Sequence, residues 1–345
     1  MQNERYANTL IGLAAGDAWG YQVEFTKYDR MPSYPVAPPS QEWRISDDTQ
    51  MTLALDRAIS ECANFADISS VTKTIIKHFQ AWKSDPDNNR APGNACMGSL
   101  ANLRRRGVHW YDSKNGARES AGCGAVMRLA PTAFAPDAYW AGLTALQAVV
   151  THRHPKAVVS ALILGDALRE AATRGGAFLD HAIAATDQLR AGTHPWGTDI
   201  YLADVLYPVT GDVAAYLVEG LDEGLQAALN RAVDDRDALR TFDPAEYGDP
   251  CVIVGEGWDA ATATALALLI ADMATAPNDE VPPLSPYEAL AWAATSNGDS
   301  DSIASMVGAV LGATSDAPAY WTQSAVHPTF EPRYAQELAT AAGRP

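Results

Sequence analysis

Apolar residues recur at intervals of three and four along most of this chain, the spacing that places them on one face of an α-helix. The run Ile303, Met306, Val307, Val310 and Leu311 is a clear example. The pattern predicts helices over the approximate ranges 4–15, 49–63, 67–83, 94–106, 138–150, 155–174, 177–190, 212–234, 258–275, 286–296 and 301–313.

Strand-like alternation hardly occurs. The best short strand is the run Cys251 to Val254, and it has no second run to pair with. No long linker, internal repeat or low-complexity segment divides the chain, although residues 176–256 carry no motif that can be interpreted. The 345 residues, 47% of them hydrophobic, suffice for a substantial core. We therefore expect an all-α fold, a compact multi-helix bundle that forms a single domain over residues 1–345.

Two glycines lie four residues apart on the last of these helices, Gly308 and Gly312. A glycine inside a helix costs about 1 kcal/mol relative to alanine. Close packing against a neighbouring helix would compensate for this cost. We therefore expect this helix, and the acidic residues at its start, to lie in the middle of the bundle.

Two clusters of carboxylates and hydroxyls each stand at the start of a predicted helix. They are Ser46-Asp47-Asp48-Thr49 and the run Gly298 to Ser302, which contains Asp299 and Asp301. Such residues are common helix N-caps. They are equally suited to a two-metal site, because Mg²⁺ and Mn²⁺ prefer hard oxygen ligands. Zinc would call for cysteine or histidine, and neither accompanies the clusters in the sequence. The clusters alone leave capping and metal binding open.

Charge and composition narrow the class of protein. The formal net charge of -17 argues against broad nucleic-acid binding, which depends on Lys and Arg that neutralise phosphates. The first residues show no secretory signal, and no apolar stretch is long enough to span a bilayer. The four cysteines have no paired spacing, so we expect them to be reduced. These features predict a cytoplasmic protein that does not bind membranes.

Seven short motifs occur in the order found in one enzyme family. They are Gly12 to Gly20 with Glu24-Phe25 behind it, Ser46 to Thr49, Arg90 to Asn94, Gly122 to Pro131, Thr151-His152, Gly255 to Trp258 and Gly298 to Ser302. From about residue 8 to about residue 315 the chain resembles the ADP-ribosylglycohydrolase family. The resemblance implies that family's all-α fold, with a central dinuclear metal site.

The resemblance also implies roles for individual residues. Two divalent cations, Mg²⁺ or Mn²⁺, would be held by Ser46, Asp47, Asp48, Asp299, Asp301 and Ser302. Two of these are serines where many relatives have threonine, which offers the same donor atom on a stiffer side chain. Glu24 is the catalytic candidate, on a loop that approaches the metals, and Asp47 and Asp48 could also accept the proton of a water. Asp17 is expected to be structural.

For the substrate, the family's binding loops fall on Gly93, Asn94, Ser120, Gly122, Cys123, Gly124, Met127 and His152. Two departures stand out. Ala121 occupies a position near which some relatives carry an aromatic residue for adenine, so stacking would have to come from Trp110, Tyr111 or His152. Residues 259–262 lack a glutamate that relatives often carry there, which could alter one edge of the acceptor pocket.

The expected function is metal-dependent hydrolysis of the glycosidic bond between ADP-ribose and an acceptor. The acceptor would belong to a protein or a small molecule, and free ADP-ribose would be the product. The acidic surface ranks ADP-ribosyl-arginine first, ADP-ribosyl-serine second and ADP-ribosylated nucleic acid third. A silent ADP-ribose binder, a crystallin-like structural protein and a metal-dependent phosphoesterase are the alternatives.

Overall fold

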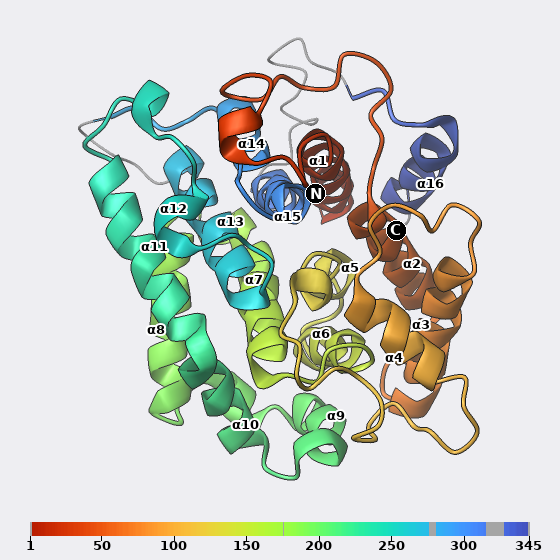
Figure 1. Ribbon diagram of the computed structural model, residues 1–345. Coiled ribbons are helices and arrows are strands. Elements are labelled where there is room, and N and C mark those ends of the chain that lie inside the picture. Colours follow the sequence, from red (N-terminus) through yellow and green to blue (C-terminus); the bar gives the residue numbers. More distant parts are fainter. Residues whose placement is uncertain (1, 175, 276–280, 315–327, 344–345) are drawn as a thin grey trace.

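The computed structural model describes residues 2–174, 176–275, 281–314 and 328–343. Within these ranges the protein is all-α, as expected, with a few isolated bridges and no sheet. Figure 1 shows the helices arranged around a central pair, α1 and α15. The α-helices are α1 (Gln2–Gly20), α2 (Asp47–Glu61), α3 (Ile68–Lys83), α4 (Asn94–Asn102), α5 (Ala130–Ala133), α6 (Trp140–Val149), α7 (Pro155–Arg174), α8 (Phe178–Arg190), α9 (Ile200–Thr210), α10 (Val213–Gly220), α11 (Gln226–Leu239), α12 (Cys251–Val254), α13 (Ala260–Thr275), α14 (Pro286–Ala294), α15 (Ser300–Ala313) and α16 (Pro332–Ala342).

Short 3-10 helices and one π-helix lie between the α-helices. The 3-10 helices are η1 (Tyr28–Arg30), η2 (Cys123–Ala125), η3 (Pro195–Thr198) and η5 (Pro244–Glu246), and the π-helix is η4 (Leu221–Leu225). Helices α2, α3, α4 and α16 cover one side of the molecule, while α7, α8, α10, α11 and α13 cover the opposite side (Figure 1). Every residue of α15 and most residues of α13 are buried, and the apolar side chains of both helices belong to the hydrophobic core between the two sides.

The central helices α1 and α15 run antiparallel with their backbones in contact. A Cβ added to Gly308 would clash with the carbonyl of Gly12, and one added to Gly312 would clash with the carbonyl of Asn8. The reciprocal contact brings Gly16 of α1 against α15. Glycine at these positions is therefore required by the packing, which confirms the expectation for Gly308 and Gly312.

Two sequence-based assignments are wrong. Cys251 to Val254 forms the short helix α12 rather than a strand. An isolated strand would leave its backbone groups unpaired, whereas a helical turn satisfies them locally, and Asp249 Oδ1 accepts from the Cys251 N–H at 3.0 Å. The expected helix 212–234 is interrupted by η4, where Gly224 adopts a φ of 131°, so α10 and α11 are separate helices.

Helices α9 and α16 were not anticipated from the pattern. Pro208 lies inside α9 and reads as a helix breaker, while α16 is short and largely polar on its outer face. In α16, the Tyr334 hydroxyl donates to Asp87 at 2.6 Å. The four cysteines are free. No helix in the described part of the chain has both the length and the apolar character needed to cross a membrane.

Candidate metal centre and substrate cleft

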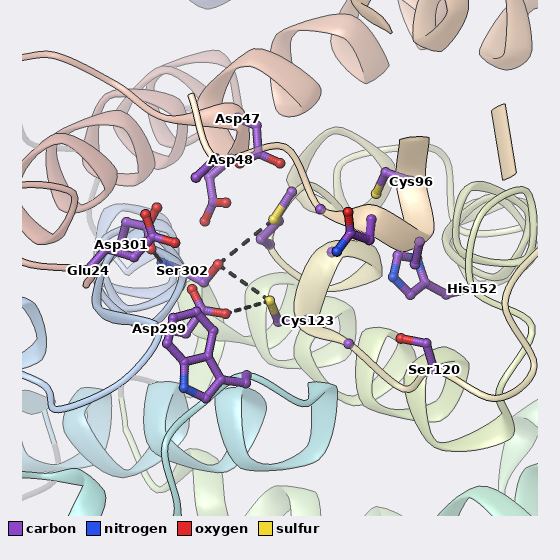
Figure 2. Close-up of a pocket in the computed structure, with 18 residues that line it drawn as sticks. Glu24, Asp47, Asp48, Cys96, Ser120, Cys123, His152, Asp299, Asp301 and Ser302 are labelled. Atoms are coloured by element: carbon purple, nitrogen blue, oxygen red, sulfur yellow. Dashed lines mark hydrogen bonds between the residues drawn. The ribbon is translucent and has the colours of Figure 1, made fainter. Parts of the chain in front are cut away.

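Glu24 meets the second acidic cluster because of the close contact between α1 and α15. At the end of α1, Gly20 lies directly against Ser300, whose Oγ donates to the Gly20 carbonyl at 2.8 Å. The turns that follow α1 carry Glu24 to the start of α15. One carboxylate oxygen from each of Glu24, Asp299 and Asp301 lies within 4.8 Å of the others. Figure 2 shows Glu24 and Asp301 side by side, with Asp299 next to them.

The first acidic cluster begins α2, and Asp17 of α1 holds it in place. Asp17 Oδ1 accepts from the Ser46 N–H at 2.8 Å, and Oδ2 accepts from the Thr49 N–H at 3.0 Å. The Ser46 hydroxyl caps the helix by accepting from the Asp48 N–H at 3.2 Å. Because Ser46 and Asp17 satisfy the free N–H groups, the carboxylates of Asp47 and Asp48 are left to line the cleft.

The carboxylates of the second cluster, Asp299 and Asp301, are likewise not occupied by capping the helix that follows them. Asp299 occupies the N-cap position of α15, yet its side chain makes no capping hydrogen bond. Its Oδ2 instead accepts from the thiol of Cys123 at 2.8 Å. Asp301 Oδ1 accepts from the Ser302 N–H at 3.0 Å. In both clusters, therefore, carboxylates face a shared space between the two helix starts (Figure 2).

Burial raises the pKa of all five carboxyl groups that line the cleft. For Glu24, Asp47, Asp48 and Asp299, repulsion from neighbouring carboxylates is the second cause. The pKa of Glu24 rises to about 10, and those of Asp47, Asp48 and Asp299 rise well above their usual range. The pKa of Asp301 is raised as well, chiefly by burial. Gathering these groups without counter-charge is costly, and a bound cation would reverse the effect.

The residues present fit divalent cations. Glu24 is only 8% exposed, and its Oε2 has no hydrogen-bond partner. Five carboxylates line the cleft, and its described lining contains no lysine or arginine that could neutralise them. A buried, unpaired carboxylate oxygen beside other carboxylates is the donor set that Mg²⁺ or Mn²⁺ accepts. In the described part of the chain, the oxygens within 4.8 Å of one another come from Glu24, Asp299 and Asp301, and Asp47 and Asp48 line the same cleft.

The cleft has a volume of about 220 Å³. All of the residues expected to bind substrate line it, namely Gly93, Asn94, Ser120, Gly122, Cys123, Gly124, Met127 and His152. Figure 2 shows the acidic side chains at one end and Ser120 and His152 at the other. The wall at residues 121–123 is fixed by pairing with residues 258–260. The Cys123 N–H donates to the Trp258 carbonyl at 3.2 Å, and the Ala260 N–H donates to the Ala121 carbonyl at 2.7 Å.

His152 lies at the end of the cleft opposite the acidic side chains, called the neutral end below, and its side chain is buried. Its Nδ1 is 2.8 Å from the hydroxyl of Thr151, which accepts from Arg128 at 2.6 Å. Burial, together with the nearby charge of Arg128, lowers the pKa of His152 to about 3. The imidazole is therefore neutral at neutral pH, and its Nε2 side lies near Gly122 and Gly124.

The structure departs from the sequence-based assignments at a few positions. Ser46 is not among the residues that line the cleft, yet its side chain hydrogen-bonds to the Asp301 carboxyl group as well as capping α2, so its role as a metal ligand stays a prediction. Trp110 and Tyr111 do not line it either, and Tyr111 stacks on His109 with ring centroids 5.2 Å apart. Sequence reasoning missed Trp258, which lines the cleft and is 43% exposed. Its position in the Gly255 to Trp258 motif was the feature of the sequence that could have indicated a place at the site.

Cys123 is the other unanticipated feature of the acidic end. Its position in a glycine-rich turn suggested backbone contacts to phosphate. The fold also brings its thiol to Asp299, 176 residues away in the sequence, and within 3.6 Å of the Ser302 hydroxyl. Burial and the neighbouring carboxylates raise the pKa of this thiol well above its usual value. The expectation that no cysteine accompanies the acidic clusters is therefore wrong in three dimensions.

Comparisons with known proteins concern the family and the fold of the chain. The sequence profile of the family described as ADP-ribosylglycohydrolase matches residues 1–344. The chain is 32% identical over 179 residues to the ADP-ribosyl-[dinitrogen reductase] glycohydrolase of Rhodospirillum rubrum, an alignment that covers 47% of this chain and 56% of that protein. It is 29% identical over 167 residues to the ADP-ribosylarginine hydrolase Tri1 of Pseudomonas putida, covering 45% of this chain and 43% of the relative.

The chain thus spans about half the length of these curated relatives. Among solved structures, it is similar to a chain described as an ADP-ribosylglycohydrolase-related protein complex. The TM-score is 0.59 at 22% identity, and the match covers 99% of this chain and 96% of that one. At 22% identity this similarity supports a shared fold and carries no conclusion about function.

Proposed function

Because the chain belongs to the ADP-ribosylglycohydrolase family, we propose that it hydrolyses the glycosidic bond between ADP-ribose and an acceptor group. The observation that carries the proposal is the convergence of five carboxylates from three separate segments on one cleft. Neither capping nor ion pairing accounts for them. A silent binding protein or a structural protein would have no use for so costly a concentration of acidic groups.

Hydrolysis of the glycosidic bond requires a positioned water and a group that accepts its proton. Because cleavage passes through an oxocarbenium-like transition state, it also requires negative charge near the anomeric carbon. Divalent cations, Mg²⁺ or Mn²⁺, when bound, would favour the ionised form of Glu24 and supply Lewis acidity beside the anomeric carbon. Ligands for them would come from Asp47, Asp48, Asp299 and Asp301, with Ser302 beside them.

Glu24 is proposed to accept the proton of the attacking water. Its Oε2 is buried and has no hydrogen-bond partner among the residues that the structure describes, so it is free to take a new hydrogen bond. Asp47 and Asp48 are the other candidates, although the Gly93 backbone N–H already donates to Asp47 and the Ser305 hydroxyl to Asp48. Glu24 therefore has the strongest claim on the water.

The neutral end of the cleft suits the rest of the nucleotide. Backbone N–H groups at Gly122 and Gly124 can approach a diphosphate closely, because glycine carries no side chain of its own. His152 is uncharged there and supplies a ring nitrogen next to those glycines. Trp258 offers the exposed aromatic face that Ala121 does not.

For the acceptor, we propose arginine first and serine second, on a protein or a small molecule. A guanidinium is cationic, and the cleft lining is acidic without a lysine or arginine among its described residues. The formal net charge of -17 favours approach of a basic peptide and opposes a nucleic acid. The names of the Rhodospirillum and Pseudomonas relatives support a protein or an arginine as the carrier of ADP-ribose.

Product analysis tests the reaction class. Mono-ADP-ribosylated peptides of known linkage would be incubated with the protein and Mg²⁺ or Mn²⁺, and the products separated by chromatography and mass spectrometry. Free ADP-ribose with regenerated peptide is the expected result. AMP would instead indicate attack on the diphosphate, and unchanged substrate would indicate a binding or structural role.

The acceptor ranking needs a comparison of matched substrates. Initial rates would be measured on two peptides of the same sequence context, one ADP-ribosylated on arginine and the other on serine. A faster rate on the arginine linkage is expected. A tenfold preference for serine would overturn the ranking while leaving the reaction class in place.

A further inference from the structure

One sulfur atom lies inside the acidic cluster. Cys123 belongs to the short η2 helix, and its Sγ is 2.8 Å from Asp299 Oδ2 and 3.6 Å from Ser302 Oγ. Figure 2 shows the thiol directed at the start of α15 and not along the loop that carries it. The side chain thus reaches the end of the cleft that is proposed to hold cations, rather than the glycine-rich end.

A second, independent observation points to a cation at the same place. Glu24 is more than nine-tenths buried, its Oε2 has no partner, and its carboxylate belongs to the group whose oxygens with Asp299 and Asp301 fall within 4.8 Å of one another. Asp299 belongs both to this group and to the thiol contact. Asp299 therefore has both the unpaired Glu24 carboxylate and the Cys123 sulfur as neighbours.

We propose that Cys123 is a ligand of one of the two cations, so that this position is a mixed sulfur and oxygen site that binds zinc or cobalt more tightly than magnesium. The proposal rests on the metal centre of the proposed function and deepens it. Thiolate sulfur favours Zn²⁺ and Co²⁺, whereas Mg²⁺ favours oxygen alone. Binding would replace the Cys123–Asp299 hydrogen bond with bonds from both atoms to the ion, and the thiol proton would pass to solvent.

Cys96 provides a matched control. It lines the same cleft, but its Sγ lies 3.3 Å from Nη1 of Arg128, a cation, and no carboxylate is hydrogen-bonded to it. Both residues are free cysteines. If any thiol in the cleft could bind the ion, Cys96→Ser and Cys123→Ser would behave alike. If only a sulfur next to Asp299 can bind the ion, Cys123→Ser will lose the metal–sulfur contact and Cys96→Ser will keep it.

Cobalt makes the sulfur contact visible without measuring activity. Metal-free protein would be titrated with Co²⁺, and the sulfur-to-cobalt charge-transfer absorption followed in the near ultraviolet. We expect this band in the wild-type protein and in Cys96→Ser, and its loss in Cys123→Ser and Cys123→Ala. Circular dichroism and Tm would verify that each variant is folded, and equilibrium dialysis would verify that Co²⁺ is still bound.

Affinity provides a second readout. Cys123→Ser should weaken Zn²⁺ binding by more than the roughly 10- to 100-fold lost when only a group that supports a metal ligand is removed, and should leave Mg²⁺ binding nearly unchanged. Bound Co²⁺ without the band, or a band that persists in Cys123→Ser, would overturn the sulfur ligand while leaving an oxygen-only metal centre. Failure of the wild-type protein to bind any divalent ion would overturn the metal centre as well.

Discussion

At the scale of single residues, Glu24 is the carboxyl group of the cleft whose burial is least compensated by hydrogen bonds. It is buried beside other carboxylates, and its Oε2 is unpaired. We expect Glu24→Gln to keep the fold and bound metal, while kcat for ADP-ribose release falls by about 10²-fold or more, the usual contribution of a positioned acid or base. Glu256→Gln is the matched control, because Glu256 is exposed and lines an adjoining pocket that shares Trp258 with the acidic cleft. Steady-state kinetics and metal analysis of both variants test this prediction. A near-normal kcat in Glu24→Gln would show that Glu24 takes no part in catalysis.

Asp301 tests the metal ligands at the same scale. It is buried next to Glu24 and Asp299, so its loss removes one of the oxygens that converge there. Asp301→Ala should therefore lose both bound metal and turnover. Metal content by mass spectrometry, measured alongside activity, checks this. Full metal occupancy in the variant would show that Asp301 is not a metal ligand.

At the scale of elements, the contact between α1 and α15 builds the site. It sets the start of α15 beside the turn that carries Glu24. Gly308→Ala would force these backbones apart and should cost about 1–3 kcal/mol or more in the free energy of unfolding, the cost typical of overpacking. Gly98→Ala in α4 is the control, because its added Cβ would meet nothing within 4 Å and should be neutral or stabilising by up to about 1 kcal/mol. Equal urea unfolding curves for the two variants would contradict this account of the packing.

The elements also show how far the sequence could be interpreted. Periodicity and the glycine pair predicted the last buried helix and its central place, because both are local properties of the chain. The β-branched residues of α12 favour a strand, and the sequence offered no second run to pair with it. That missing partner was the signal against a strand, but it did not by itself predict a helix. The thiol of Cys123 was missed for another reason. Its contact with Asp299 joins distant segments, and no spacing rule reports such a contact.

At the scale of the whole molecule, the buried acids couple stability to pH. Burial raises the pKa of Asp17 from 3.8 to about 7 and that of Glu24 from 4.5 to about 10. The folded state therefore holds these protons more tightly than the unfolded state, and the resulting stability is lost as pH rises through these values. We expect the Tm of the metal-free protein to fall between about pH 5 and 9, and the Tm gain on adding Mg²⁺ to grow over the same range. Glu24→Gln should flatten both curves, and a Tm gain that shrinks with pH would refute the coupling.

The central claim, that the acidic cleft is a metal-dependent ADP-ribosyl hydrolase site, is tested most directly by one measurement. Release of ADP-ribose from an arginine-linked peptide would be followed by mass spectrometry with the native protein, after exhaustive treatment with a chelator, and after Mg²⁺ or Mn²⁺ is restored. The account predicts that release stops on chelation and returns with the ion. Release that continues unchanged after chelation, or that never occurs with either ion, would contradict it.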